Sequence, residues 1–142
     1  AYPPTKGLPE LRQAICRYLK RRYHLTREPD EDYQVLPVAG TREALFSFAQ
    51  AILSPAGDSI TIMPNPFYQI YEGAALLAGS QPYYVNNKPD TELPDFDSIP
   101  ESIWQKCQLL YLCTPGNPSG AVIEAKVLRD LIQRSQAFKL KF

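Results

Sequence analysis

The sequence lacks a net charge and any apolar run long enough to cross a membrane. Its 142 residues carry 15 basic and 15 acidic side chains, so the formal net charge at neutral pH is zero. Proteins that bind nucleic acid or anionic membranes usually carry a basic excess, which is missing here. No apolar run approaches the roughly 18 residues of a transmembrane helix, and the start shows no signal-peptide pattern. We therefore expect neither nucleic acid nor a membrane as a partner.

The sequence has few cysteines, and their number is odd. The three cysteines are Cys16, Cys107 and Cys113, and their spacing is not that of a metal site. We predict buried free thiols in a reducing compartment, with the cytoplasm as the default location, and no metal.

The chain does contain enough apolar residues for a core. Hydrophobic residues make up 44% and charged residues 21% of the sequence, which is ordinary for a globular domain. Helical and strand-like patterns alternate, which predicts an α/β fold with three α/β/α layers and a mostly parallel sheet. The predicted strands are continuous apolar runs, as expected where helices cover both faces of a sheet. The predicted helices are residues 7–25, 41–53, 68–79, 95–104 and 124–135, and the predicted strands are 33–40, 59–63, 82–85 and 107–113.

Three of the predicted helices show an apolar stripe at helical spacing, which predicts the face that packs on the core. The stripes are Leu8, Leu11, Ile15 and Leu19; Ala44, Leu45, Phe48, Ala51 and Ile52; and Val127, Leu128, Leu131 and Ile132.

One candidate binding site follows the first predicted strand. The segment "PVAGTREAL" runs into Gly40, and Thr41 stands where the next helix begins. Free N–H groups and partial positive charge at a helix start bind phosphate, and a glycine lets a ligand approach the backbone. A plain turn with Thr41 as the N-cap explains the same pattern and remains open.

Two further strand ends carry residues suited to a flat ligand. Tyr68 and Tyr71 stand at a helix start just after a strand, where an aromatic side chain can stack on a ring. In "CTPGNPSG", Pro118 keeps Asn117 out of helical geometry, and the Asn117 amide can hold a ligand oxygen. Core packing and an ordinary Asn-Pro turn are the respective alternatives. Ligands bind at the carboxyl ends of parallel strands, so the three sites together fit a phosphorylated aromatic cofactor.

Four segments follow one another along the chain: "YPPTKGLPELRQAI", "GTREALFSFAQ", "NPFYQIYEGAALLAG" and "TPGNPSG". In this order they resemble segments of the class I/II aminotransferases, which are pyridoxal-phosphate enzymes of fold type I. The sequence resembles this family from Tyr2 to about Phe138. The resemblance implies a partial large domain over residues 1–142, with a leading helical segment over about 1–30 and an alternating, cofactor-binding part over about 31–142.

The resemblance also implies the roles of individual residues. Gly40, Thr41 and Arg42 match the turn that binds the cofactor phosphate. Tyr68 matches the aromatic residue that stacks on the pyridine ring. Asn117 matches the asparagine that hydrogen-bonds the phenolic oxygen of the ring, which helps set the protonation of the cofactor.

A homodimer or self-association is implied as well, because Tyr2 matches a tyrosine that reaches the cofactor phosphate of the neighbouring subunit. The implied cofactor is pyridoxal 5'-phosphate, and the implied small-molecule partners are an amino acid and a 2-oxo acid. Within the family, two segments resemble a transaminase of bacterial lysine biosynthesis: "GTREALFSFAQAIL" and "PNPFYQIYEGAALLAGS". This resemblance implies N-succinyl-LL-diaminopimelate and 2-oxoglutarate as the substrates.

The family places its Schiff-base lysine, the aspartate at the pyridine nitrogen and the carboxylate-binding arginine further along the sequence. None of the seven lysines here stands in the expected context. We therefore predict that the 142 residues are a central fragment with no catalytic residue of its own, inactive when alone. A truncated non-catalytic remnant and a module that binds a phosphorylated ligand are the alternatives.

Overall fold

The chain forms two compact units, Ala1–Thr41 and Arg42–Phe142. The computed structural model describes residues 2–54 and 57–138. The expected division of the chain near residue 30 stays a prediction.

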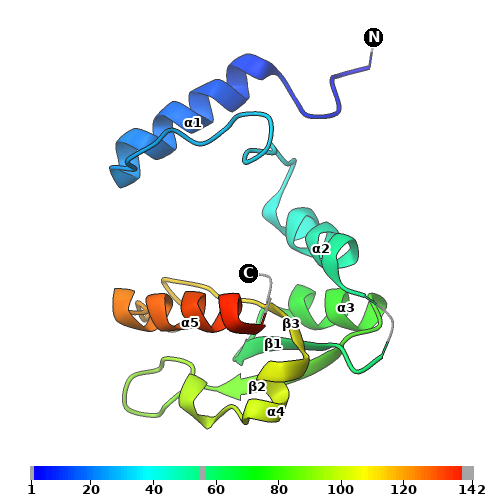
Figure 1. The fold of residues 1–142 in the computed structure, drawn as a ribbon, viewed down its shortest axis with the longest axis vertical. Coiled ribbons are helices and arrows are strands. Elements are labelled where there is room, and N and C mark those ends of the chain that lie inside the picture. Colours follow the sequence, from blue (N-terminus) through cyan, green and yellow to red (C-terminus); the bar gives the residue numbers. More distant parts are fainter. Residues whose placement is uncertain (1, 55–56, 139–142) are drawn as a thin grey trace. The chain divides into compact units, whose positions relative to one another are not determined.

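The first unit contains one helix, α1 (Pro9–Tyr23), coloured blue in Figure 1. Pro9 stands at the first helical position, where its missing N–H costs nothing, and the helix ends at His24 in the left-handed conformation. The guanidinium of Arg12 is 6% exposed and donates to the backbone oxygens of Lys6 and Gly7 on one side and Glu31 on the other. Arg12 therefore joins the segments before and after the helix.

The buried face of α1 differs from the predicted apolar stripe. Leu8 and Leu11 are 58% and 47% exposed, whereas Arg12 and Cys16 are buried. The physical reason is that residues 6–7 and 31–32 cover the Arg12 side of the helix, as the hydrogen bonds of Arg12 show.

The predicted strand over residues 33–40 is wrong. These residues form turns, bends and irregular backbone instead. A strand requires a hydrogen-bonded neighbour. Within the described ranges 2–54 and 57–138, no segment pairs with residues 33–40.

The second unit is built on a three-stranded parallel sheet. The strands are β1 (Ile60–Asn65), β2 (Gln81–Asn86) and β3 (Cys107–Leu110), in the order β2-β1-β3. All three predicted segments in this unit are confirmed as strands. β3 is shorter than expected, although the N–H of Tyr111 still donates to the Ile62 oxygen at 2.9 Å.

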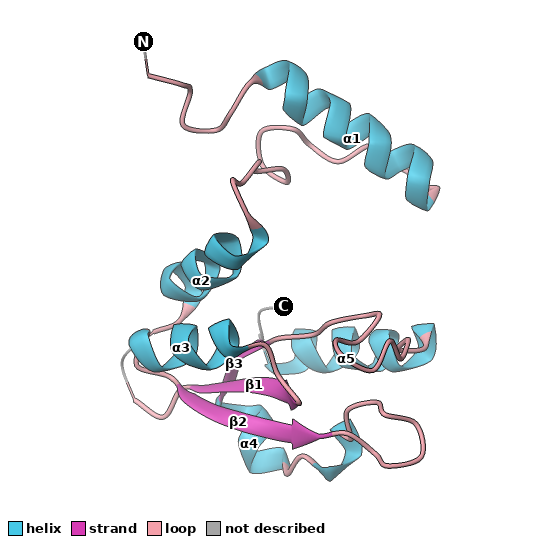
Figure 2. Ribbon diagram, turned by 180° about the vertical axis from the view of Figure 1, so that it is seen from behind, coloured by secondary structure: helices cyan, strands magenta, loops and turns pink. Residues whose placement is uncertain are grey.

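Helices cover both faces of this sheet, which confirms the predicted three-layer α/β/α fold with parallel strands (Figures 1 and 2). α2 (Thr41–Ile52) and α3 (Gln69–Leu77) supply side chains to one core, and α4 (Glu101–Lys106) and α5 (Ala125–Phe138) to the other. A short 3-10 helix, Phe96–Ser98, precedes α4. The first core contains Ala49, Leu53, Met63, Tyr71, Ala74, Ala75, Leu109 and Tyr111. The second contains Ile60, Ile62, Val85, Ile99, Trp104, Cys107, Leu110 and Leu131.

The predicted stripes of α2 and α5 are correct in part. On α2, Leu45 and Ile52 pack against the core, but Ala49 is the buried residue and Phe48 is 43% exposed. On α5, Leu131 is buried and Val127 packs against the core. The last member of that stripe, Ile132, is 51% exposed because α5 turns only one narrow face to the sheet.

Candidate functional site

The loops that follow the three strands meet at one edge of the sheet, because parallel strands end on the same side. The loops after β1 and β2 are tied at their start by the Asn65 side-chain amide, which donates to Asn86 Oδ1 at 2.8 Å. The loop after β3 carries Asn117. Pro66, from the loop after β1, and Asn117 line the same cavity.

Tyr68 stands at the start of α3 on this edge, as the sequence predicts. It is the N-cap residue of the helix, with extended backbone, and its side chain is 38% exposed. The guanidinium carbon of Arg42 lies 5.8 Å from the centre of the Tyr68 ring. The structure therefore brings together an accessible aromatic face and a positive charge.

Tyr71 and Tyr111 support Tyr68 from the core side. The rings of Tyr68 and Tyr71 meet edge to face, with centres 5.9 Å apart. Tyr71 in turn stacks on Tyr111, with centres 4.2 Å apart and planes 11° from parallel. The Tyr111 hydroxyl donates to the Leu45 oxygen of α2 at 2.9 Å. Sequence analysis missed Tyr111, because a tyrosine within the apolar run "LLYLC" resembles any strand residue.

Burial changes the acidity of both supporting tyrosines. Loss of solvent raises the pKa of Tyr111 to about 12, with a smaller contribution from Tyr71. The pKa of Tyr71 is also raised, mainly by burial and then by the nearby Cys113 and Tyr68. Both hydroxyls are therefore neutral at physiological pH and act as uncharged packing and hydrogen-bonding groups.

The loop after β3 is folded back on itself by its own backbone. Gly116 N–H donates to the Ala121 oxygen at 2.7 Å, and Gly120 N–H donates to the Gly116 oxygen at 2.7 Å. Further along, Ile123 N–H donates to Thr114 Oγ1 at 3.0 Å. These bonds hold Asn117 at the turn of the loop.

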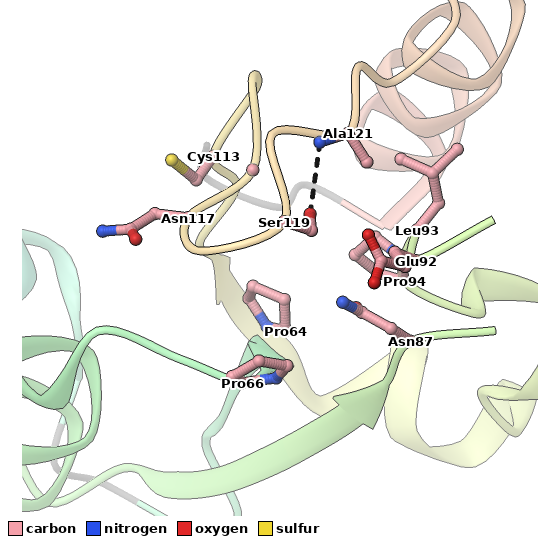
Figure 3. A pocket seen from close by; sticks show the side chains of 11 residues that line it. Pro64, Pro66, Asn87, Glu92, Leu93, Pro94, Cys113, Asn117, Ser119 and Ala121 are labelled. Carbon is pink, nitrogen blue, oxygen red and sulfur yellow. Dashed lines mark hydrogen bonds between the residues drawn. The ribbon is translucent and has the colours of Figure 1, made fainter. Parts of the chain in front are cut away.

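Asn117 is exposed, and its amide makes no hydrogen bond with any residue in the described part of the chain. Figure 3 shows the Asn117 side chain pointing away from Asn87, Glu92 and Ser119, on the same side as Cys113. An exposed amide on a hydrogen-bonded loop is available to both donate to and accept from a ligand.

A small cavity lies on the other side of this loop. It has a volume of about 30 Å³ and is bordered by the loop after β2 (Figure 3). Its polar side chains come from Asn87, Glu92 and Ser119, and Pro64, Pro66 and Pro94 provide apolar walls. Asn117 also borders it, although its amide points away (Figure 3). Sequence analysis also missed Asn87 and Glu92, since nothing in the local pattern places them beside Asn117.

The remaining predicted site residues belong to the first unit. Thr41 is confirmed as the first residue of α2, immediately after Gly40. Tyr2 is fully exposed, at 101%. The roles of these residues in binding phosphate stay predictions.

The cysteines differ in part from the expectation of buried thiols. Cys16 and Cys107 are buried, but Cys113 is exposed, and all three are free. Cys113 follows the end of β3 by three residues, where the chain has already left the core.

No helix among the described residues is long and apolar enough to cross a membrane.

Comparison with known proteins identifies the family. The sequence profile described as "Aminotransferase class I and II" matches residues 1–140. LL-diaminopimelate aminotransferases from Dehalococcoides mccartyi and Aquifex aeolicus are 38% identical over 122 residues and 31% identical over 140 residues. These matches cover 85% and 98% of this chain but 30% and 35% of the relatives. The chain therefore spans about a third of the length of these curated relatives.

Solved structures agree with this assignment. An aminotransferase from Neisseria meningitidis is 44% identical, with a TM-score of 0.91 over 99% of this chain and 35% of that one. A probable N-succinyldiaminopimelate aminotransferase from Thermus thermophilus is 25% identical, with a TM-score of 0.84 over 94% of this chain and 34% of that one. The predicted fold class, a partial fold-type-I large domain, is confirmed by these neighbours. The chain belongs to the class I and II aminotransferase family.

Proposed function

We propose that this chain provides the ring-binding part of a pyridoxal-phosphate-dependent aminotransferase site. The observation that carries the proposal is the placement of Tyr68 beside Arg42, at the sheet edge that also carries the free amide of Asn117. Members of this family generally use pyridoxal phosphate, which combines a flat ring, a phosphate group and a phenolic oxygen.

The residues present fit these three chemical groups. The accessible face of Tyr68 suits the pyridine ring, because aromatic rings stack in offset geometry. The guanidinium of Arg42 and the N-terminus of α2, with Gly40 and Thr41, suit the phosphate. The amide N–H of Asn117 suits the phenolic oxygen. Tyr2 would complete the phosphate site of a second subunit in a homodimer.

When bound, pyridoxal phosphate supplies an electron-withdrawing ring that stabilises negative charge on the substrate carbon. The chain's own residues orient that ring. Tyr68 fixes its plane, and Tyr71 and Tyr111 keep Tyr68 in place. The Asn117 amide would donate a hydrogen bond to the phenolic oxygen, which would favour the ionised form of that oxygen.

We further propose that the amino donor is a diaminopimelate-type amino acid, used in lysine biosynthesis with 2-oxoglutarate as the acceptor. The sequence indicates the N-succinyl derivative, and the Thermus thermophilus neighbour is named for that substrate. The curated relatives are named for LL-diaminopimelate itself. Both share the same reacting end and differ only at the distal amine.

The test uses the full-length protein that contains these residues. Purified protein is titrated with pyridoxal phosphate, and transamination is then measured with LL-diaminopimelate and with N-succinyl-LL-diaminopimelate. We expect saturable cofactor binding and turnover of one of the two donors in preference to the other. Failure to bind the cofactor would reject the proposed site, and binding without turnover of either donor would reject the substrate class.

A further inference from the structure

Tyr84 of β2 makes two contacts that lie on either side of Tyr68 in the chain. Its ring meets the ring of Phe67, with centres 5.2 Å apart and planes tilted by 33°. Its hydroxyl donates a hydrogen bond to Oε1 of Glu72, in the first turn of α3. Tyr68 directly follows Phe67 and precedes Glu72 by one helical turn. One side chain of the sheet therefore contacts both flanks of the residue proposed to face the cofactor ring.

The pleat of β2 directs Tyr84 toward α3. Successive side chains of a strand point to opposite faces of the sheet. Tyr83 and Val85 pack in the core with α4 and α5, so Tyr84 lies on the other face, where α3 packs on β2 (Figures 1 and 2). Tyr84 is 41% exposed, so it ties α3 to the sheet at the rim of this face and does not fill the interior.

The hydrogen bond between Tyr84 and Glu72 joins a neutral donor to a carboxylate, which is stronger than a bond between two neutral groups. The bond raises the pKa of Tyr84 above its usual value, so the hydroxyl keeps its proton and remains a donor at neutral pH. Among the residues that the structure describes, Tyr84 is the only hydrogen-bond partner of the Glu72 carboxylate.

The start of α3 depends on such a tie because it lacks a local one. Tyr68 is the N-cap residue, with φ −79° and ψ 120°, and no side chain of the described residues caps the helix there. The Tyr68 oxygen accepts the N–H of Tyr71 at 2.9 Å and so begins the first turn. Tyr71 steadies the Tyr68 ring, whereas Phe67 and Glu72 hold the backbone that carries this ring against β2.

We propose that Tyr84 is a positioning residue for the Tyr68 ring, acting through Phe67 and Glu72. The Phe67 contact holds the loop before α3, and the Glu72 bond holds the first turn of α3. The role toward the cofactor rests on the proposed function, whereas the attachment of the α3 start to β2 does not.

The first experiment uses the full-length protein and measures the dissociation constant of pyridoxal phosphate and the circular dichroism of the bound cofactor. Pyridoxal phosphate is achiral, so this dichroism arises from its fixed orientation in the protein and reports positioning. Tyr84→Leu removes both contacts, and we expect about three- to tenfold weaker binding with a reduced cofactor dichroism. Tyr84→Phe keeps the contact with Phe67 and loses the bond to Glu72, so its effect should be smaller.

Tyr83→Leu is the matched control, because Tyr83 is the neighbouring strand residue and packs against the opposite core. We expect less than a twofold change in cofactor affinity and an unchanged dichroism, whatever this substitution costs in stability. Equal losses in Tyr83→Leu and Tyr84→Leu would overturn the proposal, because general destabilisation would then explain both.

A double-mutant cycle tests whether Tyr84 acts through Tyr68. Tyr84→Leu should have almost no further effect on cofactor binding once Tyr68 is alanine. An equal loss in both backgrounds would contradict the positioning role and leave the proposed function intact, since the wild-type protein binds the cofactor in that case.

A second readout needs no cofactor. Hydrogen exchange is measured at the amide of Tyr71, whose bond to the Tyr68 oxygen begins the first turn of α3. We expect exchange to be about three- to tenfold faster in Tyr84→Leu and less than twofold faster in Tyr83→Leu. Unchanged exchange in Tyr84→Leu would reject the attachment, whether or not pyridoxal phosphate binds to the wild-type protein. Tyr84→Phe, which keeps the ring, provides the same test with a smaller expected effect if Tyr84→Leu folds poorly.

Discussion

The rings of Tyr71 and Tyr111 stack with their centres 4.2 Å apart, and the Tyr111 hydroxyl donates to the Leu45 oxygen of α2. This pair joins three elements, since Tyr71 comes from α3 and Tyr111 follows β3. Both residues belong to the core between the sheet and the α2–α3 layer. The aromatic surface offered by Tyr68 is thus the outer end of a row of tyrosines anchored in that core.

Alkaline pH should destabilise the protein through Tyr111. Its pKa is raised to about 12 by burial, against about 10 in an unfolded chain, so the folded state holds the proton more tightly. Stability contributed by this group is constant below pH 10 and falls as pH rises to 12, by at most about 3 kcal/mol. We expect Tyr111→Phe to flatten this fall in a series of denaturant-unfolding measurements across that pH range.

At neutral pH the same substitution keeps the stack but loses the bond to Leu45, at a cost of about 1 kcal/mol. An alkaline slope that is identical in wild type and Tyr111→Phe would show that the buried hydroxyl doesn't titrate as described.

Tyr68 should contribute to cofactor affinity through its ring rather than its hydroxyl. Tyr68 is 38% exposed, so part of its ring is accessible to a ligand, and aromatic stacking is worth about 0.5–1.5 kcal/mol beyond the buried area. Tyr68→Ala is expected to weaken pyridoxal phosphate binding by at least about two- to tenfold in a titration, whereas Tyr68→Phe stays close to wild type. Equal losses in both variants would mean that the hydroxyl, not the ring, makes the contact.

Anions should compete with the cofactor if Arg42 and the start of α2 hold its phosphate. We expect millimolar inorganic phosphate or sulfate to raise the apparent dissociation constant of pyridoxal phosphate, and Arg42→Met to weaken this competition. Arg134→Met is the control, because Arg134 also lies over an aromatic ring, at 4.9 Å from the centre of Trp104. The idea fails if phosphate has no effect on binding to the wild-type protein.

The sequence predicts the helices and strands of the second unit well because each of them has a clear local pattern of apolar residues. β1 and α3 are strongly patterned, and parallel strands covered on both faces leave continuous apolar runs such as "SITIM". The position of Tyr68 at the start of α3 follows directly from this order. Asn117 is likewise placed correctly at the sheet edge, since its proline and glycine neighbours exclude a strand.

What the sequence could not predict depends on partners distant in the chain. Residues 33–40 have the composition of a strand, yet none of the described segments pairs with them. On α1, the burial of Arg12 depends on the backbone oxygens of Gly7 and Glu31, which no helical periodicity reveals. The meeting of Asn87, Glu92 and Ser119 around one cavity is also visible only in three dimensions.

Arg12 should be the most sensitive charged residue of the first unit. Its guanidinium donates to the oxygens of Lys6, Gly7 and Glu31 and to the carboxylate of Asp32 at 2.6–3.2 Å. Arg12→Met leaves these acceptors without a donor, and we expect a loss of about 2–4 kcal/mol in unfolding free energy. The measurement is chemical denaturation followed by circular dichroism.

Arg17→Met is the matched control for this prediction, because Arg17 is exposed on the same helix. Its effect should stay within about 0.5 kcal/mol. Similar losses in the two variants would show that helix charge, not the buried hydrogen bonds, governs stability.

Gly116 should resist substitution because of Ser119. A Cβ atom at position 116 would lie 2.9 Å from Ser119 Oγ, so the hydroxyl must rotate and give up its bond to Ala121. We expect Gly116→Ala to cost about 1 kcal/mol and to weaken pyridoxal phosphate binding, since Asn117 is the next residue. In a Ser119→Ala background the clash is gone, so adding Gly116→Ala should cost almost nothing more.

Gly73→Ala provides the contrast: no atom lies within 4 Å of its Cβ position in α3, and alanine there should stabilise the helix by about 0.5–1 kcal/mol. A Gly116→Ala protein as stable and as cofactor-competent as wild type would show that the loop tolerates a rotated Ser119.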